Sequence, residues 1–231
     1  MDSTSIGPLR ERALQVFDRL QAYYDPPTWR SPLPPIDELI STILSQNTND
    51  RNRDAAFTNL KARFPTWEAV RDAPEAAVID AIRTAGLANQ KAPRIQTLLR
   101  EISRERGNLD LGFLSGMEVG AARAWLTHFK GVGPKTAAIV LLFSLDRPAF
   151  PVDTHIYRVT GRIGLRPEKL NLEQAHVFLE ALFPPETYFS AHLNLIRLGR
   201  EICHPHHPEC TRCPVLAVCS YGQAATNTPV S

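Results

Sequence analysis

The chain has 231 residues, of which 43% are hydrophobic and 22% charged, so it is long enough to bury one large core or two smaller ones. Its longest apolar run, residues 137–143, is far shorter than the roughly eighteen residues of a membrane span, and we expect no membrane association. The net charge of +2 does not by itself indicate a nucleic-acid partner. Between residues 121 and 169, however, eight basic residues stand against three acidic ones. This local excess favours a phosphate backbone as partner, with a solvated basic face as the alternative.

Apolar residues recur at helical spacing along the whole chain, and no segment shows the alternation of a half-buried strand. The sequence therefore predicts an all-α protein. The predicted helices cover residues 9–23, 36–44, 55–64, 76–82, 95–102, 122–129, 137–145, 156–163, 172–182 and 189–198.

Prolines indicate two domain boundaries, one in the proline-rich residues 26–35 and one near residues 146–151. We expect two helical domains. The N-terminal helix, residues 1–27, would belong with a C-terminal helical region, residues 148–222. Residues 28–147 would form a second helical domain inserted between them. The last residues, 223–231, are small and polar, and we expect them to be disordered.

The segment 129–137 contains a glycine turn that leads into a buried apolar helix. Gly131 and Gly133 permit positive φ and a close backbone approach, and Pro134 suits the first turn of the helix. Free N–H groups at such a turn bind a phosphate oxygen. Lys135 follows at the helix start. Its amine could be a nucleophile for Schiff-base chemistry, and a contact with phosphate is the alternative.

Asp153 precedes the next predicted helix and follows a proline–valine pair. Its simplest role is the N-cap of that helix, which is worth about 1 kcal/mol. A cap can also direct its carboxylate into a cleft. Lys135 and Asp153 bracket a single buried helix, so both can face the same groove.

Four cysteines, the only ones in the chain, lie close together near the C-terminus in the spacing C-x6-C-x2-C-x5-C: Cys203, Cys210, Cys213 and Cys219. This spacing suits a [4Fe-4S] cluster. Zinc is the alternative, although zinc ribbons usually have two C-x2-C pairs and this chain has one. Disulfides are less favoured, because the N-terminus lacks the apolar segment of a secretion signal.

Four short segments and the cysteine spacing together resemble a known family. The segments are LSQNT at 44–48, GLANQKA at 86–92, GVGPKTA at 131–137 and VDTH at 152–155. In this order they are similar to the endonuclease III family of helix-hairpin-helix DNA glycosylases, over residues 36–219. The chain departs from the family at Lys130, where proline is frequent, and at Ala88, where an aromatic residue is common.

The resemblance implies a helical-barrel domain with a helix-hairpin-helix, an iron–sulfur cluster domain, and a DNA-binding cleft between them. The partner would be double-stranded DNA with a damaged base or an abasic site. Lys135 would be the Schiff-base nucleophile, and Asp153 would assist proton transfer and stabilise positive charge at the sugar. Gln46 and Leu87 would enter the duplex where the damaged nucleotide leaves. The remaining expected DNA contacts are Gly131, Gly133, Lys130 and Arg212, and the four cysteines would hold the [4Fe-4S] cluster.

The expected function is that of a bifunctional DNA glycosylase and AP lyase of base excision repair. It would remove oxidised pyrimidines and cut 3′ to the abasic site by β-elimination. A thymine or uracil mismatch glycosylase on the same scaffold is one alternative. A non-catalytic DNA-binding module with a structural or redox-sensing cluster is another. We expect a monomer in the bacterial cytoplasm, associated with the nucleoid.

Overall fold

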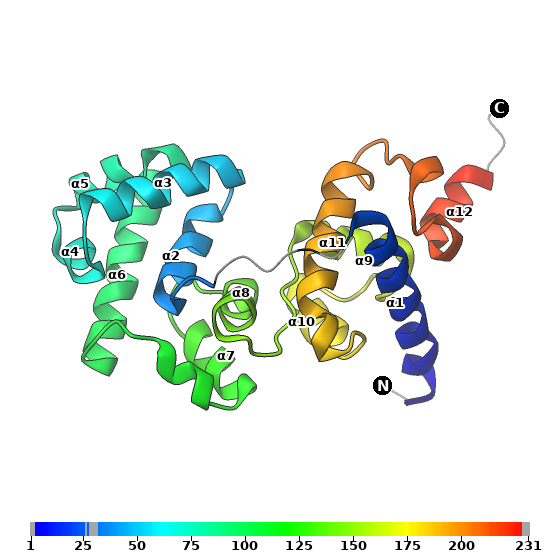
Figure 1. Cartoon of the computed structure of the whole chain (residues 1–231), viewed down its shortest axis with the longest axis horizontal. Helices are drawn as coiled ribbons and strands as arrows, with labels where there is room; N and C mark the ends of the chain where they lie inside the picture. The colour runs from blue at the N-terminus through cyan, green and yellow to red at the C-terminus, as the bar shows by residue number, and fades with distance from the viewer. Residues whose placement is uncertain (1–2, 26, 28–31, 228–231) are drawn as a thin grey trace. The chain divides into compact units, whose positions relative to one another are not determined.

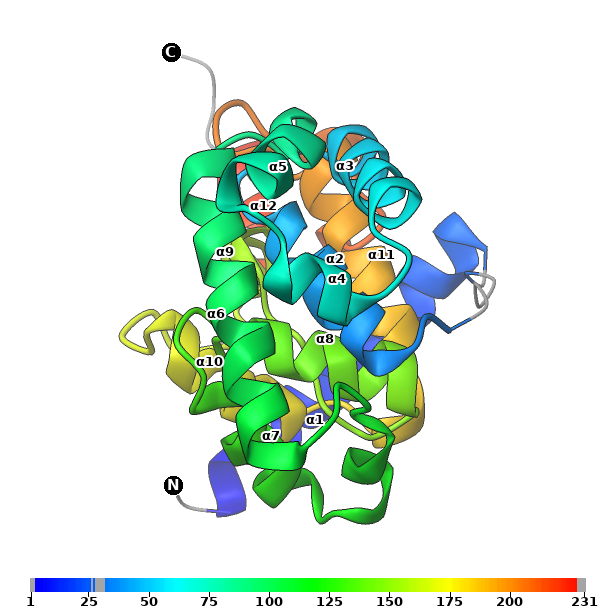
Figure 2. The same ribbon diagram turned by 90° about the vertical axis from the view of Figure 1, so that its left-hand side faces the viewer.

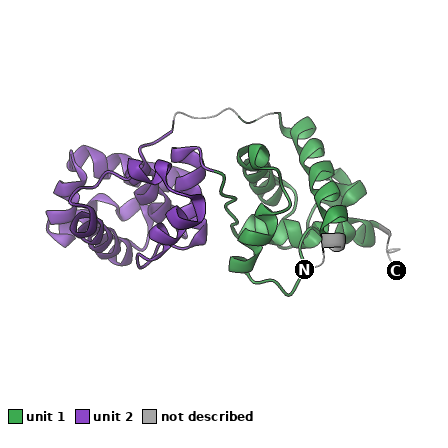
Figure 3. Ribbon diagram, turned by 90° about the horizontal axis from the view of Figure 1, so that it is seen from below, with its two compact units in different colours: residues 1–31, 148–231 green, residues 32–147 purple. Residues whose placement is uncertain are grey.

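The computed structural model describes residues 3–25, 27 and 32–227, and over these residues the chain is helical without any β-strand. The predicted all-α class is therefore confirmed. The chain divides into two compact units, residues 1–31 with 148–231 and residues 32–147 (Figure 3). The sequence placed these boundaries at residues 28 and 148, and most of the linker before residue 32 lies outside the described residues. None of the described helices has the length and apolar character needed to cross a membrane.

The unit of residues 32–147 is built around α6 and α8 (Figures 1 and 2). Its elements are α2 (Pro35–Ser45), α3 (Asp50–Arg63), α4 (Trp67–Asp72), α5 (Glu75–Ala81), η1 (Arg83–Ala85), α6 (Ala88–Arg106), η2 (Gly112–Gly116), α7 (Val119–Thr127) and α8 (Pro134–Leu145). Helix α6 contacts α2, α4 and α5, while α8 packs against α2 and α7. The side chains of α8 are apolar around most of its circumference, so this helix lies in the core and forms a rigid mount for the residues at its N-terminus.

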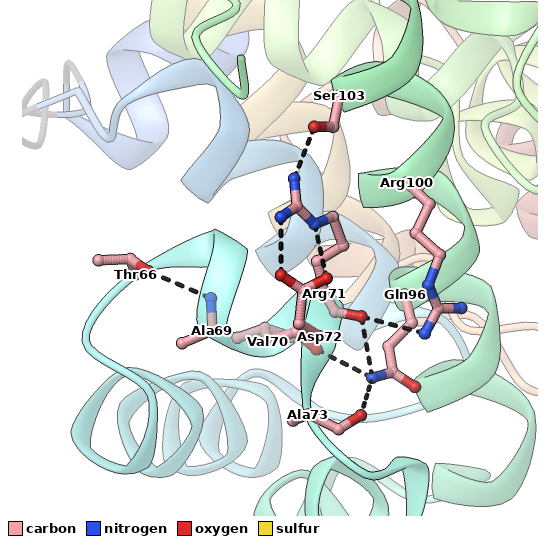
Figure 4. Close-up of polar contacts among 9 residues, drawn as sticks. All are labelled: Thr66, Ala69, Val70, Arg71, Asp72, Ala73, Gln96, Arg100 and Ser103. Atoms are coloured by element: carbon pink, nitrogen blue, oxygen red, sulfur yellow. Dashed lines mark hydrogen bonds and ion pairs between the residues drawn. The ribbon is translucent and has the colours of Figure 1, made fainter. Parts of the chain in front are cut away.

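Helix α4 has only six residues and depends on contacts from outside (Figure 4). The hydroxyl of Thr66 accepts a hydrogen bond from the N–H of Ala69 at 3.1 Å and caps the N-terminus. At the other end, the buried amide of Gln96 on α6 donates to the carbonyls of Val70 and Ala73 at 2.9 and 2.8 Å. Helix ends leave carbonyls without intrahelical partners, and a polar side chain of α6 satisfies two of them here.

The other unit combines the two ends of the chain (Figure 1). Its elements are α1 (Ser3–Tyr24), α9 (Thr154–Ile163), α10 (Leu172–Glu180), η3 (Pro185–Thr187), α11 (Tyr188–Glu201), η4 (Cys210–Arg212), η5 (Leu216–Val218) and α12 (Ser220–Asn227). Helix α11 packs against both α9 and α1. The amide of Asn194 donates to Gln21 at 3.0 Å, which ties the N-terminal helix to this region.

The expectation of disorder from residue 223 is wrong for residues 223–227, because α12 continues to Asn227. The amide of Gln223 donates to the carbonyl of Ala217 at 2.7 Å, and the hydroxyl of Thr226 donates to the carbonyl of Gly222 at 2.9 Å. Small polar residues suggested disorder, but the preceding cysteine loop supplies a surface on which the helix forms. Residues 228–231 lie outside the described part of the chain.

Candidate functional site

The predicted glycine turn joins α7 to α8, and its two glycines have different conformations. The N–H of Val132 donates to the carbonyl of Phe129 at 3.1 Å and closes the turn. Gly131 has φ of 91°, and a Cβ there would lie 2.5 Å from Cδ of Arg94, so this position requires glycine. Gly133 has φ of −93° and open space around it, so it does not use the positive φ that glycine permits. It is the N-cap of α8, where the absence of a side chain leaves the N–H groups of the first turn uncovered.

Lys135 lies in the first turn of α8, directly after the proline that begins the helix. Its side chain is half-buried and forms no hydrogen bond or ion pair with any described residue. The next residues, Thr136 and Ala137, are buried and fix the backbone that carries it. The arrangement is a single amine without a partner on a rigid support, which suits a nucleophile.

Asp153 caps α9, as its position before a helix predicted. Its Oδ1 accepts a hydrogen bond from the N–H of Ile156 at 2.8 Å, and no described residue bonds to the other carboxylate oxygen. Two buried histidines hold the preceding backbone. The Nδ1 of His192 lies 2.9 Å from the carbonyl of Pro151, and the N–H of Val152 donates to His176 at 3.3 Å. The carboxylate is thus fixed in place with one oxygen available.

Gln46 and Leu87 lie at the ends of two segments that the structure brings together. Gln46 follows α2, and its amide oxygen accepts a hydrogen bond from the guanidinium of Arg94 at 3.0 Å. Leu87 precedes α6 in a left-handed conformation, with φ of 50°, and is 47% exposed. A non-glycine residue in this conformation costs roughly 1–2 kcal/mol, and exposure of the leucine gains nothing in return. Such strain typically marks a functional position.

Two residues that sequence reasoning missed connect these segments. Lys91 is only 2% exposed, and its Nζ donates to the carbonyls of Leu44 at 2.7 Å and Ala85 at 2.9 Å. Arg94 lies one turn later on α6 and holds Gln46. The sequence gives little signal for these roles: Lys91 lies in the segment 86–92, but a lysine on a helix is usually solvated.

The two other basic residues expected to contact DNA differ in their surroundings. Lys130 is exposed on the hairpin and has no hydrogen-bond or ion-pair partner in the described part of the chain. Arg212 is already engaged: its Nε lies 2.7 Å from a carboxylate oxygen of Glu209, and its Nη2 donates to the carbonyl of Glu201 at 2.6 Å. These contacts hold the cysteine loop against the end of α11.

The four cysteines line one pocket. Apolar side chains form much of the rest of its wall: Val159, Ile163, Leu198, Ile202, Val215 and Leu216. Within the described residues, no group of three or more His, Cys, Asp or Glu side chains is arranged to hold a metal ion. The four cysteines are nevertheless the residues that could hold a metal centre, because thiolates are ligands of both zinc and iron–sulfur clusters.

Burial controls the protonation of these thiols. It raises the pKa of Cys213 to about 11 and also raises the pKa of Cys210 and of Cys219. Metal binding must therefore displace protons, because the thiolate is the ligand. Arg162 is in position to offset part of the resulting negative charge, since its Nη1 lies 3.4 Å from the sulfur of Cys203.

Residues 40–185, more than half of the chain, match the family model described as HhH-GPD superfamily base excision DNA repair protein. An Arabidopsis thaliana protein described as a DNA glycosylase is 40% identical over 168 residues, which are 73% of this chain and 57% of that protein. The chain thus spans little more than half the length of this relative. Endonuclease III of Sulfolobus acidocaldarius is 34% identical over 185 residues, covering 79% of this chain and 80% of its own.

Solved structures of endonuclease III are also similar to this chain. The chain is similar to a non-covalent endonuclease III–DNA complex, with a TM-score of 0.80 and 25% identity over 95% of this chain and 99% of that one. It is also similar to a trapped covalent intermediate of endonuclease III with DNA, with a TM-score of 0.79 and 26% identity, over 94% of this chain and 99% of that one.

Proposed function

The chain belongs to the HhH-GPD superfamily of base excision DNA repair proteins, and on that premise we propose that it is a bifunctional DNA glycosylase and AP lyase. A DNA glycosylase of the endonuclease III type is the assignment that the family match and the relatives carry. The finer proposal is removal of oxidised pyrimidines from double-stranded DNA with strand cleavage 3′ to the abasic site. The observation that supports it most is Lys135, a half-buried amine without a partner among the described residues, on the first turn of a buried helix.

The reaction begins with extrusion of the damaged nucleotide, because C1′ of its sugar cannot be attacked while the base is stacked. Extrusion costs a few kcal/mol, and least for a damaged base. Leu87 offers an exposed apolar side chain and Gln46 an amide to fill the space that the nucleotide leaves. The strained conformation of Leu87 supports this role, since it keeps the side chain out of the core.

Base release follows from attack at the sugar. A bond forms between the Nζ of Lys135 and C1′ while the bond from C1′ to the base breaks, and the base leaves with the electron pair and takes up a proton. The carboxylate of Asp153 stabilises the positive charge that develops at the sugar and assists proton transfer during the attack. Its cap to Ile156 uses one oxygen and leaves the other for this role.

Strand cleavage uses the same covalent bond. Opening of the sugar ring gives an imine between Lys135 and C1′, which makes the C2′ proton acidic. Loss of that proton and departure of the 3′ phosphate form a double bond between C2′ and C3′. Water then hydrolyses the imine and releases the amine of Lys135.

Phosphate binding is assigned to the hairpin. The turn at Gly131 and Gly133 leads into the N-terminus of α8, where backbone N–H groups can bind a phosphate oxygen. Lys130 adds an exposed positive charge beside this turn. For Arg212 the contacts with Glu209 and Glu201 support a role in holding the cysteine loop, so we assign it to the loop in place of a direct DNA contact.

We also propose that Cys203, Cys210, Cys213 and Cys219 hold a [4Fe-4S] cluster. The gathering of all four cysteines at one pocket and the cationic Arg162 beside Cys203 support a negatively charged metal–thiolate group there. When bound, the cluster contributes no step of base release or strand cleavage. Its role is to close a loop that has few backbone hydrogen bonds of regular secondary structure.

A panel of duplexes tests the proposal. The protein should release the base and cut the strand of a duplex with thymine glycol and leave an undamaged duplex intact. Release of thymine or uracil from mismatches with guanine, with thymine glycol untouched, would replace the proposal by the mismatch glycosylase. Tight binding without release from any of these duplexes would indicate a non-catalytic DNA-binding module.

A further inference from the structure

Two cationic side chains at the start of α6 contact the segments that carry Gln46 and Leu87. Lys91 donates to the carbonyl of Leu44, two residues before Gln46, and to the carbonyl of Ala85, two residues before Leu87. Both carbonyls belong to the last turns of helical elements, where no intrahelical N–H is available. A single buried ammonium group therefore joins the backbones of both segments.

Arg94 fixes the side chain of Gln46 in one orientation. A guanidinium group has donors and no acceptor, so the amide atom facing it at 3.0 Å is the oxygen. The NH₂ group of Gln46 is consequently turned away from Arg94. The stem of Arg94 lies against the hairpin turn, since a Cβ on Gly131 would come within 2.5 Å of its Cδ. The hairpin thus limits the movement of the arginine that holds Gln46.

Burial of the Lys91 ammonium group costs free energy, and the contacts of Lys91 offset this cost only in part. No described carboxylate forms an ion pair with Lys91, and burial, with the nearby Arg94, lowers its pKa. The negative ends of two helical elements compensate part of this cost. A buried methionine would avoid it, but it would leave the two carbonyls unsatisfied and the two segments unconnected.

We propose that Lys91 and Arg94 are positioning residues for base extrusion, which hold Gln46 and Leu87 in fixed register so that both enter the duplex together. The inference rests on the proposed function. Neither residue touches the reacting sugar in this account; both act through the residues they hold. Misplacement by about 1 Å at a reacting centre can cost a hundredfold in rate, so loss of this bridge should be measurable.

The chain offers matched controls on the same helix. Gln96 is as buried as Lys91 and also satisfies backbone carbonyls, those of Val70 and Ala73, which belong to α4 and its C-cap (Figure 4). Arg100 donates to the carbonyl of Arg71 at 3.0 Å, likewise outside the segments of Gln46 and Leu87. Gln96→Met and Arg100→Met therefore remove comparable polar contacts from α6 and leave the bridge intact.

The test compares Lys91→Met and Arg94→Met with these two controls, at temperatures where unfolding curves show each variant folded. We expect Lys91→Met and Arg94→Met to release thymine glycol about tenfold to a hundredfold more slowly in single turnover. They should also lose the fluorescence increase of a 2-aminopurine placed beside the lesion, which reports unstacking. Borohydride trapping on single-stranded DNA with a preformed abasic site needs no extrusion and should persist. Gln96→Met and Arg100→Met should match the wild type in all three measurements.

The results of these measurements can overturn either the positioning role of Lys91 and Arg94 or the proposed function. Wild-type release rates in Arg94→Met, or losses no greater than those of Gln96→Met, would overturn the inference. If Lys91→Met does not fold, Arg94→Met decides, together with a Gln46→Ala background in which its effect should disappear. An undiminished effect of Arg94→Met in that background would also overturn it. A wild-type protein inactive on both substrates would refute the proposed function, whereas an active wild type with insensitive variants would refute only the bridge.

Discussion

The carboxylate of Asp153 accepts a hydrogen bond from the backbone N–H of Ile156 at 2.8 Å, so a residue proposed for catalysis also caps the helix behind it. The two roles use different properties of the side chain. The cap needs an oxygen that accepts a hydrogen bond, whereas stabilisation of a cationic sugar needs a negative charge. Substitutions can therefore separate them.

Asp153→Asn should keep the helix cap and lose most of the base-release activity. The asparagine oxygen accepts the same hydrogen bond, so the free energy of unfolding should change by less than about 0.5 kcal/mol. Base release should fall by about a hundredfold to a thousandfold, because a neutral amide does not stabilise positive charge. Asp153→Ala should in addition lose about 1 kcal/mol of stability. Urea unfolding and single-turnover base release measure the two effects, and near wild-type release by Asp153→Asn would reduce Asp153 to a cap.

Leu87→Gly should separate stability from function in the opposite direction. Leu87 has φ of 50° and is 47% exposed, so glycine relieves backbone strain at little loss of packing. We expect a free energy of unfolding between unchanged and about 1 kcal/mol higher, with release of thymine glycol slowed at least tenfold. Unfolding curves and single-turnover rates test this. A variant that is markedly less stable, or fully active, would contradict the proposed role of the leucine.

The two glycines of the hairpin should respond differently to alanine. Gly131→Ala should cost at least about 1 kcal/mol, because alanine disfavours φ of 91° and its Cβ would meet Arg94. Gly133→Ala should change stability by less than about 0.5 kcal/mol, since φ is negative and the surrounding space is open. Thermal unfolding compares them directly. Equal losses in the two variants would mean that the hairpin is not held as the structure shows.

The cysteine cavity should contain iron. Purified protein should be yellow-brown with about four irons per chain and without stoichiometric zinc. Cys210→Ser should be poorly soluble, because the loop loses the group that closes it. Metal analysis and the visible absorption spectrum provide the measurement. A colourless, zinc-loaded and active preparation would contradict the assignment.

Local patterns predicted the parts of the site that depend on neighbouring residues in sequence. The hairpin, the start of α8 after Gly133 and the cap by Asp153 all follow from glycine, proline or aspartate at a helix start. The conformation of Gly133 was not predictable, because glycine permits positive φ without requiring it. The helical structure of residues 223–227 was not predicted, because it depends on contacts with the cysteine loop, on which α12 forms.

The contacts of Lys91 and Arg94 were beyond sequence reasoning for a different reason. Lys91 reaches Leu44 across 47 residues, and Arg94 reaches Gln46 across 48. A lysine on a helix is usually solvated, so no local pattern indicates that this one is buried between two helix ends. Only the packing of α6 against α2 shows it.

The central claim is that the Nζ of Lys135 forms the covalent bond to C1′, and borohydride trapping tests it most directly. Reduction during reaction with a thymine-glycol duplex should give a stable protein–DNA adduct, and mass spectrometry of the digested adduct should place the sugar on Lys135. Lys135→Gln should bind an abasic-analogue duplex with near wild-type affinity and give no adduct. Trapping undiminished in Lys135→Gln, or an adduct on another residue, would contradict the account.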